Sequence, residues 1–187
     1  RRQRQMCIRD RYGVEYSIVR DNYITSQNFE GDTLFSVQDN VYDYIIGNPP
    51  YLKIPKDADE ARVMPSICYG APNLYFLFWA MGIHNLKEGH ELVYIVPRSW
   101  TSGAYFKKFR EYFFKNCVIT DMHLFESRDK VFEGESVLQE TVIVKVKKTT
   151  ATPEYINITS SSTSQFTDLK TFRAPYATVA VSYTHLR

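Results

Sequence analysis

Residues 73–97 read NLYFLFWAMGIHNLKEGHELVYIVP, a long apolar segment followed by a short β-branched one. The segment 73–86 is too long for an ordinary strand, and it predicts a helix that is apolar on most sides and therefore buried against a sheet. Pro72 and Gly89 flank it, as expected for a helix start and a helix end. The segment 91–96 predicts a strand that the following proline ends.

The same alternation continues on both sides of this pair. Aromatic residues spaced at i, i+1, i+4, i+7 and i+8 predict an amphipathic helix over residues 103–116. Further strands are expected at 23–28, 42–46, 118–125 and 140–148, and a long loop is expected at 52–72. Strands that alternate with helices predict an α/β fold built on a doubly wound sheet.

Composition and charge narrow the possible classes of protein. The chain has 187 residues, of which 44% are hydrophobic and 15% aromatic, so it is a folded chain and not a disordered one. Its net charge of +2 comes from the ends: residues 1–12 contribute +4 and Arg187 +1, which leaves −3 between them. A basic arm is one form of nucleic-acid tether. The terminal sequences instead resemble translated sequencing-library adapter, so residues 1–12 and 181–187 are expected to be non-native extensions.

Several kinds of site are not expected. The three cysteines are too scattered for a disulfide framework or a zinc site, and the four histidines lack metal-binding spacing, so no metal is predicted. The longest apolar run, residues 74–83, is too short to cross a bilayer, and no signal peptide is visible. The sequence therefore predicts a cytoplasmic protein that does not act at a membrane. The basic residues Lys107, Lys108, Arg110 and Lys115 are interpreted as the outer face of helix 103–116, either solvated or in contact with DNA phosphates.

The tetrad Asn48-Pro49-Pro50-Tyr51 follows directly after the predicted strand 42–46. Ligands of open α/β sheets bind at the carboxyl ends of strands. The prolines lack N–H groups, so the side-chain oxygen of Asn48 and the carbonyl of Pro49 are available to accept both protons of an exocyclic amine. Tyr51 offers a flat surface on which a flipped base can stack. The alternative is a rigid exit turn with no chemical role.

The segment YDYIIGNPPY (42–51) resembles a motif of the methyltransferases that transfer a methyl group from S-adenosylmethionine to adenine N6. The segments NLYFLF (73–78), VPRSWTSGAYFKKFR (96–110) and HLFESRDKVFEGESVLQETVIV (123–144) resemble the same family in the same order. They are most similar to γ-class type II modification methylases of the PstI and BsuBI type. The resemblance covers about two-thirds of the chain and implies a partial doubly wound, Rossmann-like methyltransferase sheet.

The resemblance also implies a role for individual residues. Asp32 matches the acidic residue that binds the adenine of the cofactor, and Thr33 stands where the family often has a stacking aromatic. Asn48 and Pro49 match the acceptors of the target amine. Tyr51 and Phe132 match the two aromatics that stack on the flipped base. Phe132 taken alone is better interpreted as a core residue, and the family match makes the two interpretations equal.

The chain lacks one expected feature of such an enzyme. The family binds the methionine end of its cofactor at a G-x-G loop, and no two of the eight glycines form one. We therefore expect residues 13–150 to be part of a catalytic domain that is inactive alone. Residues 151–180 are rich in Ser and Thr and are expected to be a linker or the start of a target-recognition region.

The resemblance implies double-stranded DNA as the partner, in a bacterial or archaeal cytoplasm. A cognate restriction endonuclease belongs to such systems, without a stable complex being implied. Two alternatives remain open at this point. One is a methyltransferase that uses the same tetrad on a protein glutamine or an RNA amine, and the other is a nucleic-acid-binding module without enzymatic activity.

Overall fold

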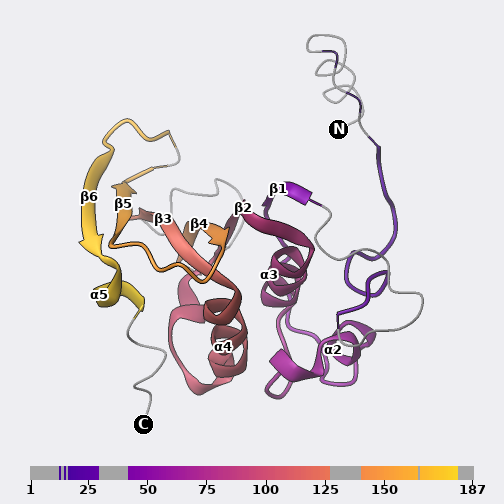
Figure 1. Ribbon diagram of the computed structural model, residues 1–187. Coiled ribbons are helices and arrows are strands. Elements are labelled where there is room, and N and C mark those ends of the chain that lie inside the picture. The colour runs from indigo at the N-terminus through magenta and orange to yellow at the C-terminus, as the bar shows by residue number, and fades with distance from the viewer. Residues whose placement is uncertain are drawn as a thin grey trace.

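The computed structural model describes Gly13, Glu15 and residues 17–29, 42–126, 140–163 and 165–180. Within these residues the strands form one mixed sheet in the order β1-β2-β4-β3-β5-β6 (Figure 1). The strands are β1 (Tyr42–Gly47), β2 (Leu86–Pro97), β3 (Cys117–Phe125), β4 (Thr141–Lys148), β5 (Tyr155–Ser161) and β6 (Lys170–Pro175). The predicted α/β class is confirmed.

Helices α3 (Leu74–Asn85) and α4 (Lys107–Asn116) lie on the same side of the sheet and contact each other (Figure 1). The described chain also contains the short helices α2 (Asp59–Val63) and α5 (Tyr176–Ala180). Three 3-10 turns occupy Pro65–Ile67, Arg98–Thr101 and Ala104–Phe106. The strands on either side of each long helix run parallel in the sheet, as β–α–β crossovers require.

The apolar segment 73–86 forms α3, as predicted. The side chain of Asn73 caps the helix by accepting a hydrogen bond from the amide of Tyr75 at 3.2 Å. Trp79 and eight other residues of the helix are buried. The Trp79 ring packs edge-on against Trp100 and Phe113, at centroid distances of 4.9 and 5.0 Å. This aromatic cluster joins α3 and α4 to the sheet.

The predicted strand at 23–28 is wrong, because these residues form a turn. The side-chain oxygen of Asn22 accepts hydrogen bonds from the amides of Ile24 and Thr25, at 3.0 and 3.2 Å. Such local side-chain bonds replace the partners that a strand would supply. Ile24 is fully buried, which explains why the segment is apolar without being a strand. The expected loop 52–72 is likewise partly helical, since it contains α2.

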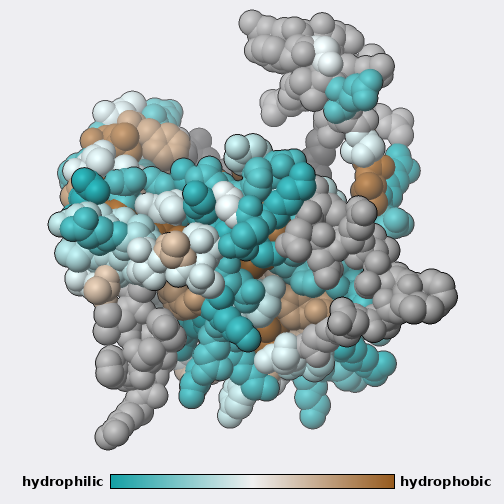
Figure 2. All heavy atoms as spheres, viewed as in Figure 1, coloured by the Kyte–Doolittle hydropathy of each residue, from teal (hydrophilic) through white to brown (hydrophobic). Residues whose placement is uncertain are grey.

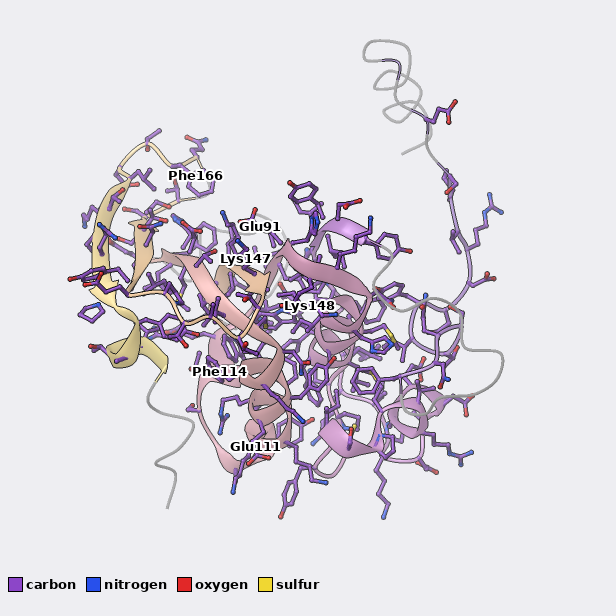
Figure 3. All side chains as sticks on the ribbon, in the orientation of Figure 1. Glu91, Glu111, Phe114, Lys147, Lys148 and Phe166 are labelled. Carbon is purple, nitrogen blue, oxygen red and sulfur yellow. The ribbon has the colours of Figure 1, made fainter. Side chains whose placement is uncertain are left out.

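The Ser/Thr-rich segment after residue 150 contributes two strands to the same sheet, where the sequence predicted a linker or a new module. β5 pairs in parallel with β3, and β6 pairs with β5. The ring of His123 on β3 lies between the hydroxyls of Thr159 and Ser161, at 2.8 and 3.0 Å. Serine and threonine therefore hold β5 to the sheet by hydrogen bonds that local sequence patterns do not show. Figure 2 shows apolar surface over the β5–β6 end of the sheet, and Figure 3 places the side chain of Phe166, which is 43% exposed, at the same end.

The basic face expected on helix 103–116 needs one correction. Lys107, Lys108 and Lys115 are exposed, but Arg110 is only 2% exposed. Arg110 lies one helical turn from both Phe106 and Phe113, at the border of the apolar stripe. Its guanidinium therefore turns into the protein and not toward solvent.

Candidate functional site

The tetrad lies immediately beyond the carboxyl end of β1. The register of β1 against β2 pairs Gly47 with Tyr94, so Asn48 follows the last paired residue of the strand. Asn48 and Pro50 are exposed, Pro49 is buried and Tyr51 is half-buried. Asn48 is therefore accessible at the end of the strand, next to the buried Pro49.

The ring of Tyr51 is held in place by its hydroxyl. The hydroxyl donates a hydrogen bond to the carbonyl of Ile95 on β2, at 2.9 Å. Burial raises the pKa of Tyr51 to about 12, so the phenol stays protonated and keeps this donor at neutral pH. The ring meets Tyr75 of α3 edge-on, with centroids 6.2 Å apart and planes at 84°. Tyr51 is therefore a fixed aromatic platform and not a freely rotating side chain.

A cavity of about 480 Å³ adjoins the tetrad on its β1 side. Five of its eleven lining residues are aromatic, and three residues of the tetrad, Asn48, Pro49 and Pro50, also line it. It is lined by Tyr23, Tyr42, Tyr44, Ile45, Ile46, Gly47, Asn48, Pro49, Pro50, Phe78 and Tyr94. A Cβ added at Gly47 would lie 2.9 Å from the Tyr94 ring, so only glycine fits here without a shift of that ring. Such a largely apolar hollow with a few polar groups is typical of a small-molecule site.

A second cavity of about 240 Å³ lies beside Tyr75, the ring that Tyr51 contacts. It is lined by Lys53, Asn73, Tyr75, Ser99, Tyr105 and Phe106. Sequence patterns do not predict this group of residues, because they come from segments far apart in the chain. One signal was available: Lys53 stands two residues after Tyr51, and alternate residues of an extended segment lie on the same side.

The structure brings together four of the predicted site residues, Asn48 to Tyr51, because they are consecutive. Asp32, Thr33 and Phe132 lie outside the described residues, so their predicted roles stay predictions.

Arg110 holds the loop that follows β2 against the second cavity. Its guanidinium donates to the carbonyls of Trp100, Ser102 and Gly103, at 3.0, 3.1 and 2.9 Å. Burial lowers the pKa of this guanidinium, although an arginine remains charged at neutral pH. The three bonds fix the loop on which Ser99 stands.

The described residues offer neither a metal site nor a membrane-spanning helix. No group of three or more His, Cys, Asp or Glu side chains within them could hold a metal ion. None of their helices is both long enough and apolar enough to cross a membrane.

The mixed sheet with the tetrad at the end of β1 has the fold of S-adenosylmethionine-dependent methyltransferases. A candidate class I enzyme of that kind from Listeria monocytogenes superimposes with a TM-score of 0.53 at 20% identity, over 82% of this chain and 43% of that one. The type IIG restriction endonuclease BpuSI superimposes with a TM-score of 0.56 at 18% identity, over 76% of this chain and 20% of that one. The chain belongs to the Eco57I restriction-modification methylase family, whose model matches residues 9–132.

Two curated relatives support this assignment. The type II methyltransferase M.BsuBI of Bacillus subtilis is 32% identical over 90% of this chain and 34% of its own length. The type II methyltransferase M.PstI of Providencia stuartii is 35% identical over 75% of this chain and 28% of its own length. The chain therefore spans about a third of the length of these curated relatives.

Proposed function

We propose that this chain is part of a DNA methyltransferase of a restriction–modification system that transfers a methyl group from S-adenosylmethionine to adenine N6 in duplex DNA. The observation that carries the proposal is the tetrad Asn48 to Tyr51 at the carboxyl end of β1, in a chain of this family. The tetrad supplies the acceptors for an exocyclic amine, and the resemblance of its flanking segments assigns adenine.

Asn48 and Pro49 are proposed to hold the amine. The side-chain oxygen of Asn48 and the carbonyl of Pro49 each accept one N–H hydrogen, so both amine protons are bound from the same side. An adenine amine normally shares its lone pair with the ring. Fixing both protons away from the ring plane favours a pyramidal nitrogen whose lone pair points at the incoming methyl group. The prolines keep this geometry because they restrict φ and add no competing donor.

Tyr51 is proposed to stack on the base after it leaves the duplex. Its hydroxyl bond to the Ile95 carbonyl sets the orientation of the ring before DNA arrives, so little side-chain entropy is lost on stacking. Phe132 is proposed as the second aromatic, on the opposite face of the base. An unpaired base held between two rings regains part of the stacking energy that flipping costs.

The cofactor is proposed to bind in the cavity that adjoins the tetrad. Its aromatic wall suits an adenine ring, and Gly47, which has no Cβ, leaves the backbone open beside the ring of Tyr94. Asp32 and Thr33 are proposed to complete this site at the adenine end. When bound, S-adenosylmethionine supplies an activated sulfonium methyl group. The residues of this chain then have to position the amine and exclude water, which is where most of the rate gain arises.

Double-stranded DNA in a bacterial or archaeal cytoplasm is the proposed partner, with a cognate restriction endonuclease in the same system and no stable complex between them. The catalytic region is proposed to include residues 13–150, with target recognition supplied by later sequence. The chain alone is expected to show negligible methyl transfer, because it has no G-x-G loop.

The test uses the longer protein that contains this chain, unmethylated duplex DNA and cofactor labelled in its methyl group. We expect label in DNA, recovered as N6-methyladenine after digestion. Asn48→Ala removes one amine acceptor and should lower the rate by ~100-fold or more, the usual loss when a transition-state contact is deleted. Asn48→Asp keeps an acceptor oxygen, so its rate of methyl transfer should fall less than that of Asn48→Ala.

Each of the remaining outcomes contradicts part of the proposal. Label recovered as N4-methylcytosine would refute adenine as the target. Label found only in protein or RNA would favour an amine methyltransferase with another substrate. DNA binding that survives Asn48→Ala, without methyl transfer by the wild-type protein, would indicate a binding module.

A further inference from the structure

The second cavity, beside Tyr75, is lined by none of the residues to which the proposed function assigns the target amine, the base or the cofactor. Its six lining residues include the types that contact nucleic-acid phosphates in proteins: a lysine, a serine, an asparagine and two tyrosines. None of the six is acidic. Phe106 closes the remaining wall with an apolar ring. This composition favours an anion over a neutral or cationic ligand.

Lys53 supplies the charge. It is exposed, and within the described ranges it has no carboxylate at ion-pair distance. Its backbone is held in place, because the segment after Tyr51 forms an antiparallel bridge in which Lys53 pairs with Asn73. Two backbone hydrogen bonds of 2.8 Å enclose this bridge. The Ile54 amide donates to the Pro72 carbonyl, and the Leu74 amide donates to the Leu52 carbonyl.

Tyr75 and Ser99 supply a neutral donor. Their hydroxyl oxygens are 3.3 Å apart, so one hydroxyl donates to the other. The pair carries two hydroxyl hydrogens and uses only one of them internally. The other is left to donate to a ligand. Burial raises the pKa of Tyr75, so its hydroxyl remains protonated. In contrast, Tyr105 already donates to the Ala71 carbonyl at 2.5 Å and serves as wall.

The N-terminus of α3 does not supply the donors. The amide of Leu74 is bonded to Leu52, and the amide of Tyr75 is bonded to the Asn73 side chain. Side chains of the lining residues, Lys53, Tyr75 and Ser99 among them, are therefore the groups that a ligand would meet.

We propose that this cavity binds a backbone phosphate of the DNA strand that carries the target base, with Lys53 as its cation and the Tyr75–Ser99 pair as its neutral donor. The inference rests on the proposed function for the identity of the strand. The edge contact between Tyr51 and Tyr75 makes the base platform and this cavity neighbours. A strand whose base lies on Tyr51 thus has its phosphates within reach of Lys53, which follows Tyr51 by two residues.

The experiment measures binding of the chain to short oligo(dA) by fluorescence anisotropy over a range of salt concentrations. A single strand needs no base flipping, so methyl transfer is not required. Lys53→Gln removes one phosphate contact and should reduce the slope of log K against log salt by about 0.7. At ~0.1 M salt, this reduction in slope corresponds to about fivefold weaker binding of Lys53→Gln than of the wild type. Ser99→Ala should weaken binding by a few fold without changing the slope, because the hydroxyl is neutral.

Lys56→Gln is the matched control, since Lys56 is an exposed lysine of the same segment that does not line the cavity. It should leave the slope and the affinity within error of the wild type. Equal slopes of log K against log salt for the wild type and Lys53→Gln would overturn the phosphate site. Methyl transfer to DNA by the longer protein would in that case still support the proposed function. A slope that Lys56→Gln reduces as much as Lys53→Gln would show diffuse attraction and would also overturn it. If the wild-type chain binds no oligo(dA), the inference is wrong, and the methylation test decides the proposed function separately.

Discussion

Replacing Arg110 tests the role of the buried guanidinium most directly. The side chain is 2% exposed and donates three hydrogen bonds to backbone carbonyls of the loop after β2. Arg110→Met keeps the apolar stem of the side chain but removes all three donors. The carbonyls then have to find water or remain without a partner.

The magnitude follows from where the three acceptors lie. The bond to the Trp100 carbonyl is buried, and a charged hydrogen bond lost there costs ~2 kcal/mol or more. Ser102 and Gly103 are exposed, so water can replace the guanidinium at their carbonyls at a cost of about 1 kcal/mol together. We expect Arg110→Met to lower the free energy of unfolding by about 3 kcal/mol. Arg110→Lys should retain less than half of this stabilisation, because one ammonium group cannot donate in the planar geometry of a guanidinium.

Urea unfolding followed by tryptophan fluorescence measures the change, since Trp79 and Trp100 are both buried. Lys108→Met on the same helix is the control, because Lys108 is exposed and its replacement should stay within ~0.5 kcal/mol of the wild type. A loss of less than about 1 kcal/mol in the free energy of unfolding of Arg110→Met would refute the role given to the three hydrogen bonds.

Three further perturbations follow from local geometry. Gly82→Ala places a Cβ 2.8 Å from the buried Leu92 side chain, so we expect a loss of ~1–3 kcal/mol in urea unfolding; an unchanged midpoint would contradict that packing. Asn73→Ala removes the cap of α3 and should cost about 1 kcal/mol, with Asn73→Ser restoring most of it; equal loss in both variants would contradict the capping role. Burial lowers the pKa of His123 below its usual 6.5, so the unfolded chain binds a proton that the folded chain does not. The free energy of unfolding should therefore fall as the pH drops below about 6.5, by at most ~1.4 kcal/mol per pH unit. His123→Gln should make the free energy of unfolding depend less on pH. A pH profile identical to that of the wild type would refute the role given to His123.

The local periodicity of apolar residues was sufficient to predict the central helices and strands of the fold. The helix at 73–86 and the strands at 42–46, 91–96, 118–125 and 140–148 agree with the structure to within a few residues, apart from β2, which begins earlier. Their patterns are strong because each element buries a long apolar face. The prediction failed at 23–28, where buried Ile24 gives an apolar signal but the Asn22 side chain imposes a turn.

The sequence by itself determined the α/β class and the tetrad, since both depend on residues that are neighbours in the chain. Only the tertiary structure decided that Arg110 is buried, that β5 joins the sheet beside β3, and that Lys53 shares a cavity with Ser99. The physical reason is the same in each case. A charged or hydroxyl side chain becomes part of the interior when carbonyls or hydroxyls from distant segments are placed around it, and that placement is a product of strand pairing and helix packing.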